Sequence, residues 1–295
     1  MFLKILFRGD QLPVTYSFRN VICNVVLIFA LAFPQIGQAE VQAANHRQNI
    51  SDKAWEELRI AAFQSRDIIE GPEQNVLGIK VPYRAEDATI VPISIHTRIP
   101  QSTTLYVKKI HVYIDKNPLP LVGIFDMTSE SGRADLAMRV RVDTFSYIRA
   151  IAEMNTGELY MTKSFVRATG ACSAPPPKSI SDSITNMGSM KIRNVGELEL
   201  SKPNLVQLKI KHPNITGLQP MKIGSRVMPP PHFISQFTVA YAGKTVLSAQ
   251  LTFSVSMDPS FRFYFVPASE GTMTVEATDT QNNHWNLDYK MESSS

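Results

Sequence analysis

The sequence has few of the residues that mark enzymes and metal proteins. It contains only two cysteines in 295 residues, Cys23 and Cys172, too few for a zinc site of paired cysteines. No glycine-rich phosphate loop follows a predicted strand, and neither a nucleophile elbow nor an HExxH helix is present. The six histidines are scattered, and no local motif marks a catalytic serine. We therefore predict no catalytic residue, no metal site, no cofactor and no enzymatic activity.

The chain also lacks the dense basic stripe that nucleic-acid binding requires. Its formal net charge is only +4, and the strongest local cluster is Lys209 and Lys211 beside His212. These residues occupy alternate positions of a predicted strand, so we interpret them as a solvated strand face. We expect no nucleic-acid partner.

The amino terminus carries the three parts of a signal peptide. Lys4, Arg8 and Arg19 precede the apolar run VICNVVLIFALAF, and Gly37 and Ala39 give a small-x-small cleavage pattern. The run is shorter than the roughly 20 residues that a membrane-spanning helix needs, although an uncleaved anchor stays open. We predict cleavage after Ala39, a periplasmic location and no membrane attachment of the mature chain.

Cleavage would remove Cys23 and leave Cys172 without an internal partner. A leftover cysteine in a secreted chain indicates an intermolecular bond or a free reactive thiol. A disulfide-linked dimer is one form that such a thiol can take in an oxidising compartment.

Cys172 lies in a stretch of small residues, VRATGACSAPPPK, which stiffens into three prolines. Its neighbours offer little apolar surface to bury with it, so we predict an exposed arm made of Thr169, Gly170, Ala171 and Ser173. The flanking basic residues are expected to favour the nucleophilic thiolate: Arg167 and Lys178. Cys172 is the candidate for a covalent attachment point.

Two other interpretations of Cys172 stay open at this stage. Most free cysteines behave as small buried hydrophobic residues. Copper is the second alternative, because the secreted chain also offers soft thioether donors near the cysteine in sequence: Met161, Met187 and Met190.

The hydrophobic pattern predicts a short helix followed by strands. ISDKAWEELRIAAFQSRDIIEGP has a helical stripe, with Ser51 or Asp52 as the N-cap. Apolar residues then alternate in ATIVPISIHT, KKIHVYID and DLAMRVRVD, and again in LVQLKIK, FISQFTVAY and TVLSAQLTFSV. Short strands with frequent turn signals predict an all-β protein with two immunoglobulin-like antiparallel β-sandwich domains.

The same pattern divides the chain into four parts. Residues 1–39 form the signal peptide and residues 50–167 the first sandwich. Periodicity disappears near residue 169, so residues 168–203 are predicted to form the cysteine-bearing arm and a flexible linker. Residues 204–290 form the second sandwich.

The two sandwiches resemble the two subunits of the SoxYZ carrier of sulfur oxidation. VPYRAEDATIVPISI, IDKNPLPLVGIF, MRVRVDTFSYIRAIAE and GELYMTKSFVRATGAC resemble successive SoxY segments. LKIKHPNITGL, MPPPHFISQFTVAYAGKTVLSAQ and SVSMDPSFRFYF resemble SoxZ. The fused arrangement is similar to the SoxYZ-like carriers associated with quinoprotein dehydrogenases.

This resemblance implies a function for Cys172. SoxY carries one cysteine on a glycine-rich arm, and sulfur intermediates are attached to it covalently. The chain is therefore expected to be a carrier that holds a sulfur adduct on Cys172 for periplasmic redox enzymes, either a quinoprotein dehydrogenase or sulfur-oxidation proteins. It departs from SoxY in two ways, since Ala171 and Ser173 flank the cysteine and the chain continues beyond the arm.

An alternative function is a docking module for a quinoprotein dehydrogenase, in which the cysteine is incidental. Its docking surface would lie around residues 212–217 or 229–232 of the second sandwich. The sequence does not distinguish a sulfane sulfur, a thiosulfonate or a sulfur-bearing one-carbon unit as the cargo.

Overall fold

The computed structural model describes residues 42–43, 45–71, 75–220 and 227–292. The predicted signal peptide, with Cys23, lies outside the described residues. Contacts divide the chain after His46, and residues 47–295 form the larger unit. Within the described ranges, no helix combines the length and the apolar character needed to cross a membrane.

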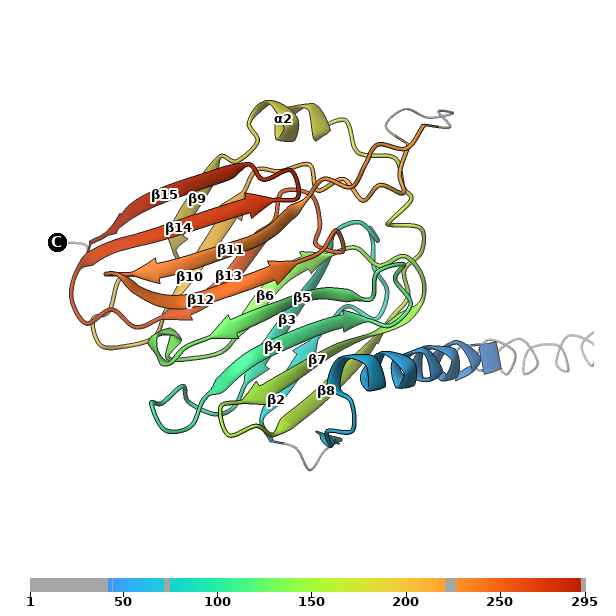
Figure 1. The fold of residues 1–295 in the computed structure, drawn as a ribbon, viewed down its shortest axis with the longest axis horizontal. Coiled ribbons are helices and arrows are strands. Elements are labelled where there is room, and N and C mark those ends of the chain that lie inside the picture. Colours follow the sequence, from blue (N-terminus) through green and yellow to red (C-terminus); the bar gives the residue numbers. More distant parts are fainter. Residues whose placement is uncertain (1–41, 44, 72–74, 221–226, 293–295) are drawn as a thin grey trace, which may run out of the picture. The chain divides into compact units, whose positions relative to one another are not determined.

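The described strands form two sheets (Figure 1). The first has nine strands in the order β1-β8-β7-β4-β5-β12-β11-β14-β15. Their bounds are β1 Ile68–Glu70, β4 Val107–Ile114, β5 Leu121–Met127, β7 Ser146–Met154, β8 Leu159–Val166, β11 Ile234–Tyr241, β12 Lys244–Leu251, β14 Gly271–Asp279 and β15 His284–Met291. The second has six described strands in the order β2-β3-β6-β13-β10-β9. Their bounds are β2 Leu77–Lys80, β3 Val91–Thr97, β6 Leu136–Val140, β9 Met190–Asn194, β10 Asn204–Ile210 and β13 Ser260–Phe265.

The alternating sequences form the strands that their period predicts. In β3, Val91, Ile93 and Ile95 are buried, while Pro92 and His96 on the other face are exposed. The inner faces of both sheets meet in one large core, where the ring of Phe261 lies 4.7 Å from that of Phe237 across the sandwich. The prediction of an all-β, immunoglobulin-like sandwich fold is confirmed.

Both sheets continue from the first half of the chain into the second. In the nine-stranded sheet, β5 pairs antiparallel with β12, which places Phe125 opposite Ala249 and Gly123 opposite Leu251. In the six-stranded sheet, β6 lies beside β13. The two predicted sandwiches are thus joined edge to edge by backbone hydrogen bonds, which leaves neither half with an open strand edge at the junction.

The predicted helix is present over residues 47–63, but its N-cap prediction is wrong. Ser51 and Asp52 lie inside the helix and bind the sheet instead. Ser51 donates to Asp115, and Arg149 from β7 contacts both Asp115 and Asp52. Arg149 is only 1% exposed, so its charge is neutralised by these carboxylates in the interior.

Aromatic side chains complete the attachment of this helix. Trp55 and Phe63 form a second small core with Tyr113 of β4, and the guanidinium of Arg149 lies 4.9 Å from the Trp55 ring. The cation is therefore held both by carboxylates and by an aromatic face.

The region predicted as a flexible arm and linker, residues 168–203, contains regular structure. Within these residues the chain forms the helix α2 (Ile180–Thr185) and then the strand β9. A short 3-10 helix, η1 (Ser129–Ser131), lies outside this region, between β5 and β6. β9 pairs antiparallel with β10 and places Ile192 opposite Leu208. The alternation in β9 is short and follows a glycine- and serine-rich stretch, which explains why its sequence has linker composition.

Candidate functional site

Cys172 is buried, which contradicts the predicted exposed arm. The side chain is 1% exposed, and that of Ala171 is equally covered. Thr169, Gly170 and Ser173 are exposed, so the segment lies on the surface and turns its cysteine inward. Cys172 is a free cysteine, and no second cysteine occurs in the described part of the chain.

Hydrogen bonds from both halves of the chain hold this cysteine segment, residues 169–174. The backbone N–H of Cys172 donates to Asp143 Oδ1 at 3.0 Å, and that of Gly170 donates to the Asp143 carbonyl at 2.6 Å. From the second half, Thr216 Oγ1 donates to the Cys172 carbonyl at 2.7 Å. The composition of the segment could not reveal this cover, because Thr216 is 44 residues away in the sequence.

The environment favours the thiol over the thiolate, which overturns the predicted activation by Arg167 and Lys178. Burial raises the pKa of Cys172 from its ordinary 9.0 to about 12, and the negative charge of Asp143 adds to the rise. The charge of Arg141 opposes it. The guanidinium of Arg167 lies instead over the ring of Phe145, at 5.3 Å.

Arg141 is the buried cation whose charge acts on the pKa of the Cys172 thiol. It is 4% exposed and donates from Nη1 to the carbonyls of Phe253 and Val255, at 3.0 and 2.8 Å. None of the described carboxylates forms an ion pair with it, and burial lowers its pKa to about 10. A cavity of about 40 Å³ beside it is lined partly by Ala171 and Ala174. A buried positive charge that pairs with none of the described carboxylates thus lies beside the cysteine segment.

The soft donors proposed for copper lie in different parts of the fold. Met161 of β8 packs in the small core with Trp55, and Met190 packs against the large core. Met187 follows α2. The structure therefore does not gather these methionines around Cys172.

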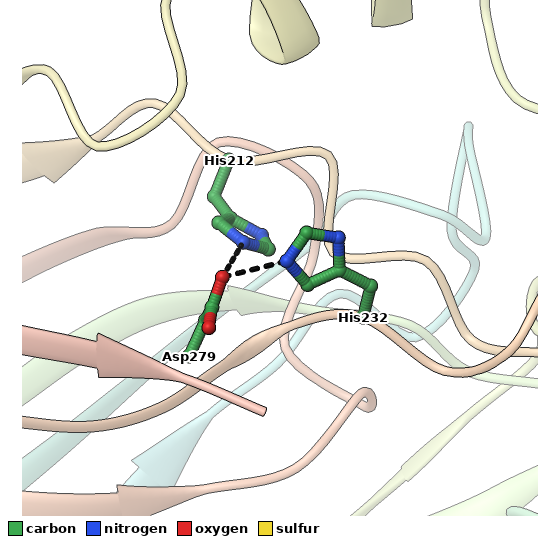
Figure 2. A group of neighbouring side chains, drawn as sticks. All are labelled: His212, His232 and Asp279. Atoms are coloured by element: carbon green, nitrogen blue, oxygen red, sulfur yellow. Dashed lines mark hydrogen bonds and ion pairs between the residues drawn. The ribbon is translucent and has the colours of Figure 1, made fainter. Parts of the chain in front are cut away.

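The structure does gather two of the histidines that look scattered in the sequence (Figure 2). His212 follows β10, His232 precedes β11, and Asp279 ends β14. Asp279 Oδ2 lies 2.6 Å from His232 Nε2 and 3.5 Å from His212 Nε2. All three side chains are buried. The predicted absence of a metal site did not consider this group, because its members are up to 67 residues apart.

The electrostatics of this group fix its protonation at neutral pH. Burial lowers the pKa of His212 to about 4, and the charge of His232 lowers it further in the same direction. Burial would raise the pKa of Asp279, but hydrogen bonds from Asn283 and His232 outweigh it and hold the value at about 2. Asp279 is therefore ionised and His212 neutral.

The histidine group and the cysteine segment share one stretch of chain. Residues 211–216 carry His212 and end at Thr216, the residue that holds the Cys172 carbonyl. Ile215 pairs with His232 through a pair of backbone hydrogen bonds, at 2.6 and 2.9 Å. This stretch is largely buried, so most of the docking surface predicted around residues 212–217 is not accessible.

The fold and the site define a class: a β-sandwich protein in which one free thiol lies where two joined halves meet. Comparison with protein families gives the particular members. Residues 60–172 match the family model of sulfur oxidation protein SoxY, and residues 192–290 match that of sulphur oxidation protein SoxZ. The chain is therefore a SoxY–SoxZ fusion. The SoxY match ends at Cys172, and the SoxZ match includes β9.

Matches among solved structures include a SoxY protein. The sulfur carrier protein SoxY from Chlorobium limicola f thiosulfatophilum shares 24% identity, and the match covers 40% of this chain and 94% of that chain, with a TM-score of 0.33. A superoxide reductase (neelaredoxin) from Ignicoccus hospitalis shares 12% identity over 34% of this chain and 94% of that chain, with a TM-score of 0.31. No curated protein sequence matches this chain.

The two family matches give the general role. SoxY and SoxZ domains make the chain a carrier protein of sulfur oxidation. Its general kind of partner is another sulfur-oxidation protein. The predicted resemblance to a SoxY–SoxZ fusion is confirmed.

Proposed function

We propose that this protein is a periplasmic carrier that holds a sulfur-containing intermediate covalently on Cys172. The observation that supports this most directly is the position of Cys172 as the last residue of the SoxY match. The cysteine is free, and it follows β8 at the point where the chain leaves the first half. The predicted signal peptide, residues 1–39, supports the periplasmic location.

Loading requires the cysteine segment to open, because the sulfur is buried. Two hydrogen bonds hold the residue itself, from its N–H to Asp143 and from Thr216 to its carbonyl. Each contributes on the order of 1 kcal/mol, so opening is energetically accessible. Gly170 provides a hinge, since it adopts a left-handed φ of 78° and has no atom within 4 Å of the position of a Cβ.

The covalent step forms one sulfur–sulfur bond. The Cys172 thiol and a thiol-containing substrate lose two protons and two electrons as the bond forms, and a partner redox enzyme accepts the electrons. Reduction of the same bond by a partner releases the cargo and restores the thiol. Opening hydrates the segment and removes the burial that raises the thiol pKa, so the reactive thiolate forms in the opened segment, which a partner would stabilise by binding it.

The second candidate is a docking module for a quinoprotein dehydrogenase. The observation that favours it is the burial of Cys172, whose pKa of about 12 makes the closed form unreactive. In this function the sulfur would never become accessible, and a disulfide-linked dimer would not form either. The carrier function requires the sulfur to become accessible after opening, and an accessible sulfur can also form a disulfide-linked dimer.

Mass spectrometry of the intact protein and its peptides, without reductant, tests the carrier function. The protein is isolated from the periplasm of its own host, during growth on the natural substrate. We expect a reductant-sensitive adduct confined to the peptide that contains Cys172, and its mass identifies the cargo.

A Cys172→Ser variant provides the matched control. It should lose the adduct and the host function that depends on it, while keeping the fold. Full function with Cys172→Ser, together with an unmodified thiol in the native protein under all growth conditions, would establish the docking module instead.

A further inference from the structure

Three potential metal ligands converge in the second half of the chain. His212, His232 and Asp279 each offer one ligand atom, and these atoms all lie within 4.8 Å of one another. They come from three different strand ends and point toward one another (Figure 2). Both imidazoles turn Nε2 toward the same oxygen, Asp279 Oδ2. The group lies within the SoxZ match, and the carrier function proposed above does not use it.

From this geometry we propose that His212, His232 and Asp279 bind a divalent transition-metal ion, of which Zn²⁺ fits best. Two imidazole nitrogens and one carboxylate oxygen are a ligand set typical of zinc sites. The absence of thiolate and thioether ligands from the set makes monovalent copper a poor match. Three protein ligands leave a fourth position for water or another ligand.

Neighbouring residues orient the carboxylate toward the ion. Asp279 Oδ1 accepts the backbone N–H groups of Gln281 and Asn283, at 2.8 and 2.9 Å. These bonds fix one oxygen in the turn between β14 and β15. The other oxygen, Oδ2, is thereby directed toward the two imidazoles, and the amide of Asn283 supports it at 2.9 Å. Such outer hydrogen bonds are a regular feature of metal sites.

Asn214 allows His212 to present its lone pair at Nε2. The amide nitrogen of Asn214 donates to the carbonyls of Val255 and Ser256, so its Oδ1 faces His212 Nδ1 at 2.8 Å. A proton on Nδ1 can donate to this oxygen, which leaves Nε2 free to bind a cation. The backbone N–H of Asn214, 3.0 Å from the same Nδ1, fits the other tautomer, in which Nε2 donates to Asp279.

The two tautomers correspond to two states of the site. In the empty state the Nε2 proton of His212 lies between the imidazole and the carboxylate. In the bound state the His212 proton moves to Nδ1, the proton between His232 Nε2 and Asp279 moves to the other ring nitrogen of His232 or is released to solvent, and the ion lies between the three ligand atoms. The Asp279 carboxylate supplies a negative charge toward the dication, and His232, at 8%, is the most exposed of the three ligands.

Isothermal titration of the full chain with Zn²⁺, in the absence of chelator, tests the proposal. We expect one ion per chain, a raised melting temperature, and a Co²⁺ complex with visible absorption. Trp285, whose ring lies 6.1 Å from that of His212, should lose fluorescence when Cu²⁺ is added. These readouts are independent of Cys172, so a failure of the carrier function leaves them unchanged.

Variants assign the binding to these residues. His232→Gln and Asp279→Asn should each weaken Zn²⁺ binding by at least about 100-fold. His284→Asn is the matched control, because His284 is an exposed histidine outside the group whose side chain hydrogen-bonds to Thr278. It should bind as the unaltered chain does.

Two results would overturn the proposal: no binding of Zn²⁺ or Co²⁺ by the full chain, or binding that His232→Gln leaves unchanged. If the variants fail to fold, diethylpyrocarbonate labelling of the unaltered protein still decides. Zn²⁺ should protect His232 from modification while His284 remains reactive, and equal labelling with and without Zn²⁺ would refute the site.

Discussion

At Cys172 the fold favours the protonated sulfur, although transfer chemistry requires the thiolate. A raised pKa means that the folded chain binds the thiol proton more tightly than the unfolded chain does. Unfolding therefore releases a proton above about pH 9, and Cys172 lowers the stability of the fold as the pH rises from there toward 12. Below pH 9 the residue has no such effect.

The rate of iodoacetamide labelling should reveal this pKa. A value of about 12 against 9.0 predicts that Cys172 reacts up to about 10³-fold more slowly at pH 7 in the folded chain than in urea, with opening of the segment reducing the difference. The rate should rise about tenfold per pH unit, without levelling below pH 9. A rate that levels between pH 7 and 8 would show an activated thiolate and contradict the buried environment.

Thr216 controls how often the cysteine segment opens. Its hydroxyl donates to the Cys172 carbonyl at 2.7 Å. Thr216→Val removes this bond, together with the bonds of the hydroxyl to Gln219 and Leu218, and keeps the shape of the side chain. Labelling at pH 8 should therefore accelerate at least about fivefold, as the loss of about 1 kcal/mol implies. Thr216→Ser keeps the hydroxyl and should label like the unaltered protein. Equal rates for both variants would mean that another contact keeps the segment closed.

At the scale of elements, Gly188 positions β9 against β15. It has a left-handed φ of 80°, and a Cβ there would lie 1.9 Å from Nε1 of Trp285. Gly196 also has a left-handed φ, of 107°, but no atom within 4 Å of its Cβ position. Alanine at either glycine would strain the backbone, but only alanine at Gly188 would also overlap a neighbouring side chain, so comparing the two variants distinguishes backbone strain from steric overlap.

Gly196→Ala should lower the free energy of unfolding by roughly 1–2 kcal/mol through backbone strain alone. Gly188→Ala should cost about 1–3 kcal/mol more, because Trp285 must move. Urea unfolding measures both, and the emission of Trp285 should shift only in Gly188→Ala. Equal losses of stability would show that the indole moves aside without cost.

The sequence predicts a structural element well where a local pattern determines it. It predicts poorly where contact with a residue far away in the sequence determines the structure. The alternation of Val91, Ile93 and Ile95 suffices to identify β3. The same local reasoning makes Ser51 a helix cap, whereas Asp115, 64 residues away, is its actual partner. The prediction that Cys172 is exposed is wrong for the same reason. Small neighbouring residues indicate an exposed segment only when no distant part of the chain covers that segment.

At the scale of the whole molecule, the junction of the two halves is the feature that local patterns could not reveal. Each half has its own strand alternation, so the sequence predicts two separate sandwiches. Pairing of β5 with β12 depends on the shape of both edges. Gly123 permits it, because a Cβ at this position would lie 2.8 Å from the Gln250 carbonyl on the neighbouring strand.

This shared sheet predicts that both halves unfold together. The chain has two tryptophans, Trp55 against the first half and Trp285 in the second, so Trp55→Phe and Trp285→Phe each leave a reporter for one half. Their urea midpoints should coincide after correction for the stability cost of each substitution, measured by circular dichroism.

Gly123→Val forces β5 from β12 and should separate the midpoints, while Gly243→Ala, at a hairpin turn with no atom within 4 Å of its Cβ position, should not. Separate midpoints without Gly123→Val would mean that the halves are independent domains. Coincident midpoints mean that neither half unfolds alone, so the cysteine segment, which hydrogen-bonds to Asp143 in one half and Thr216 in the other, can leave these anchors in the folded protein only by local opening.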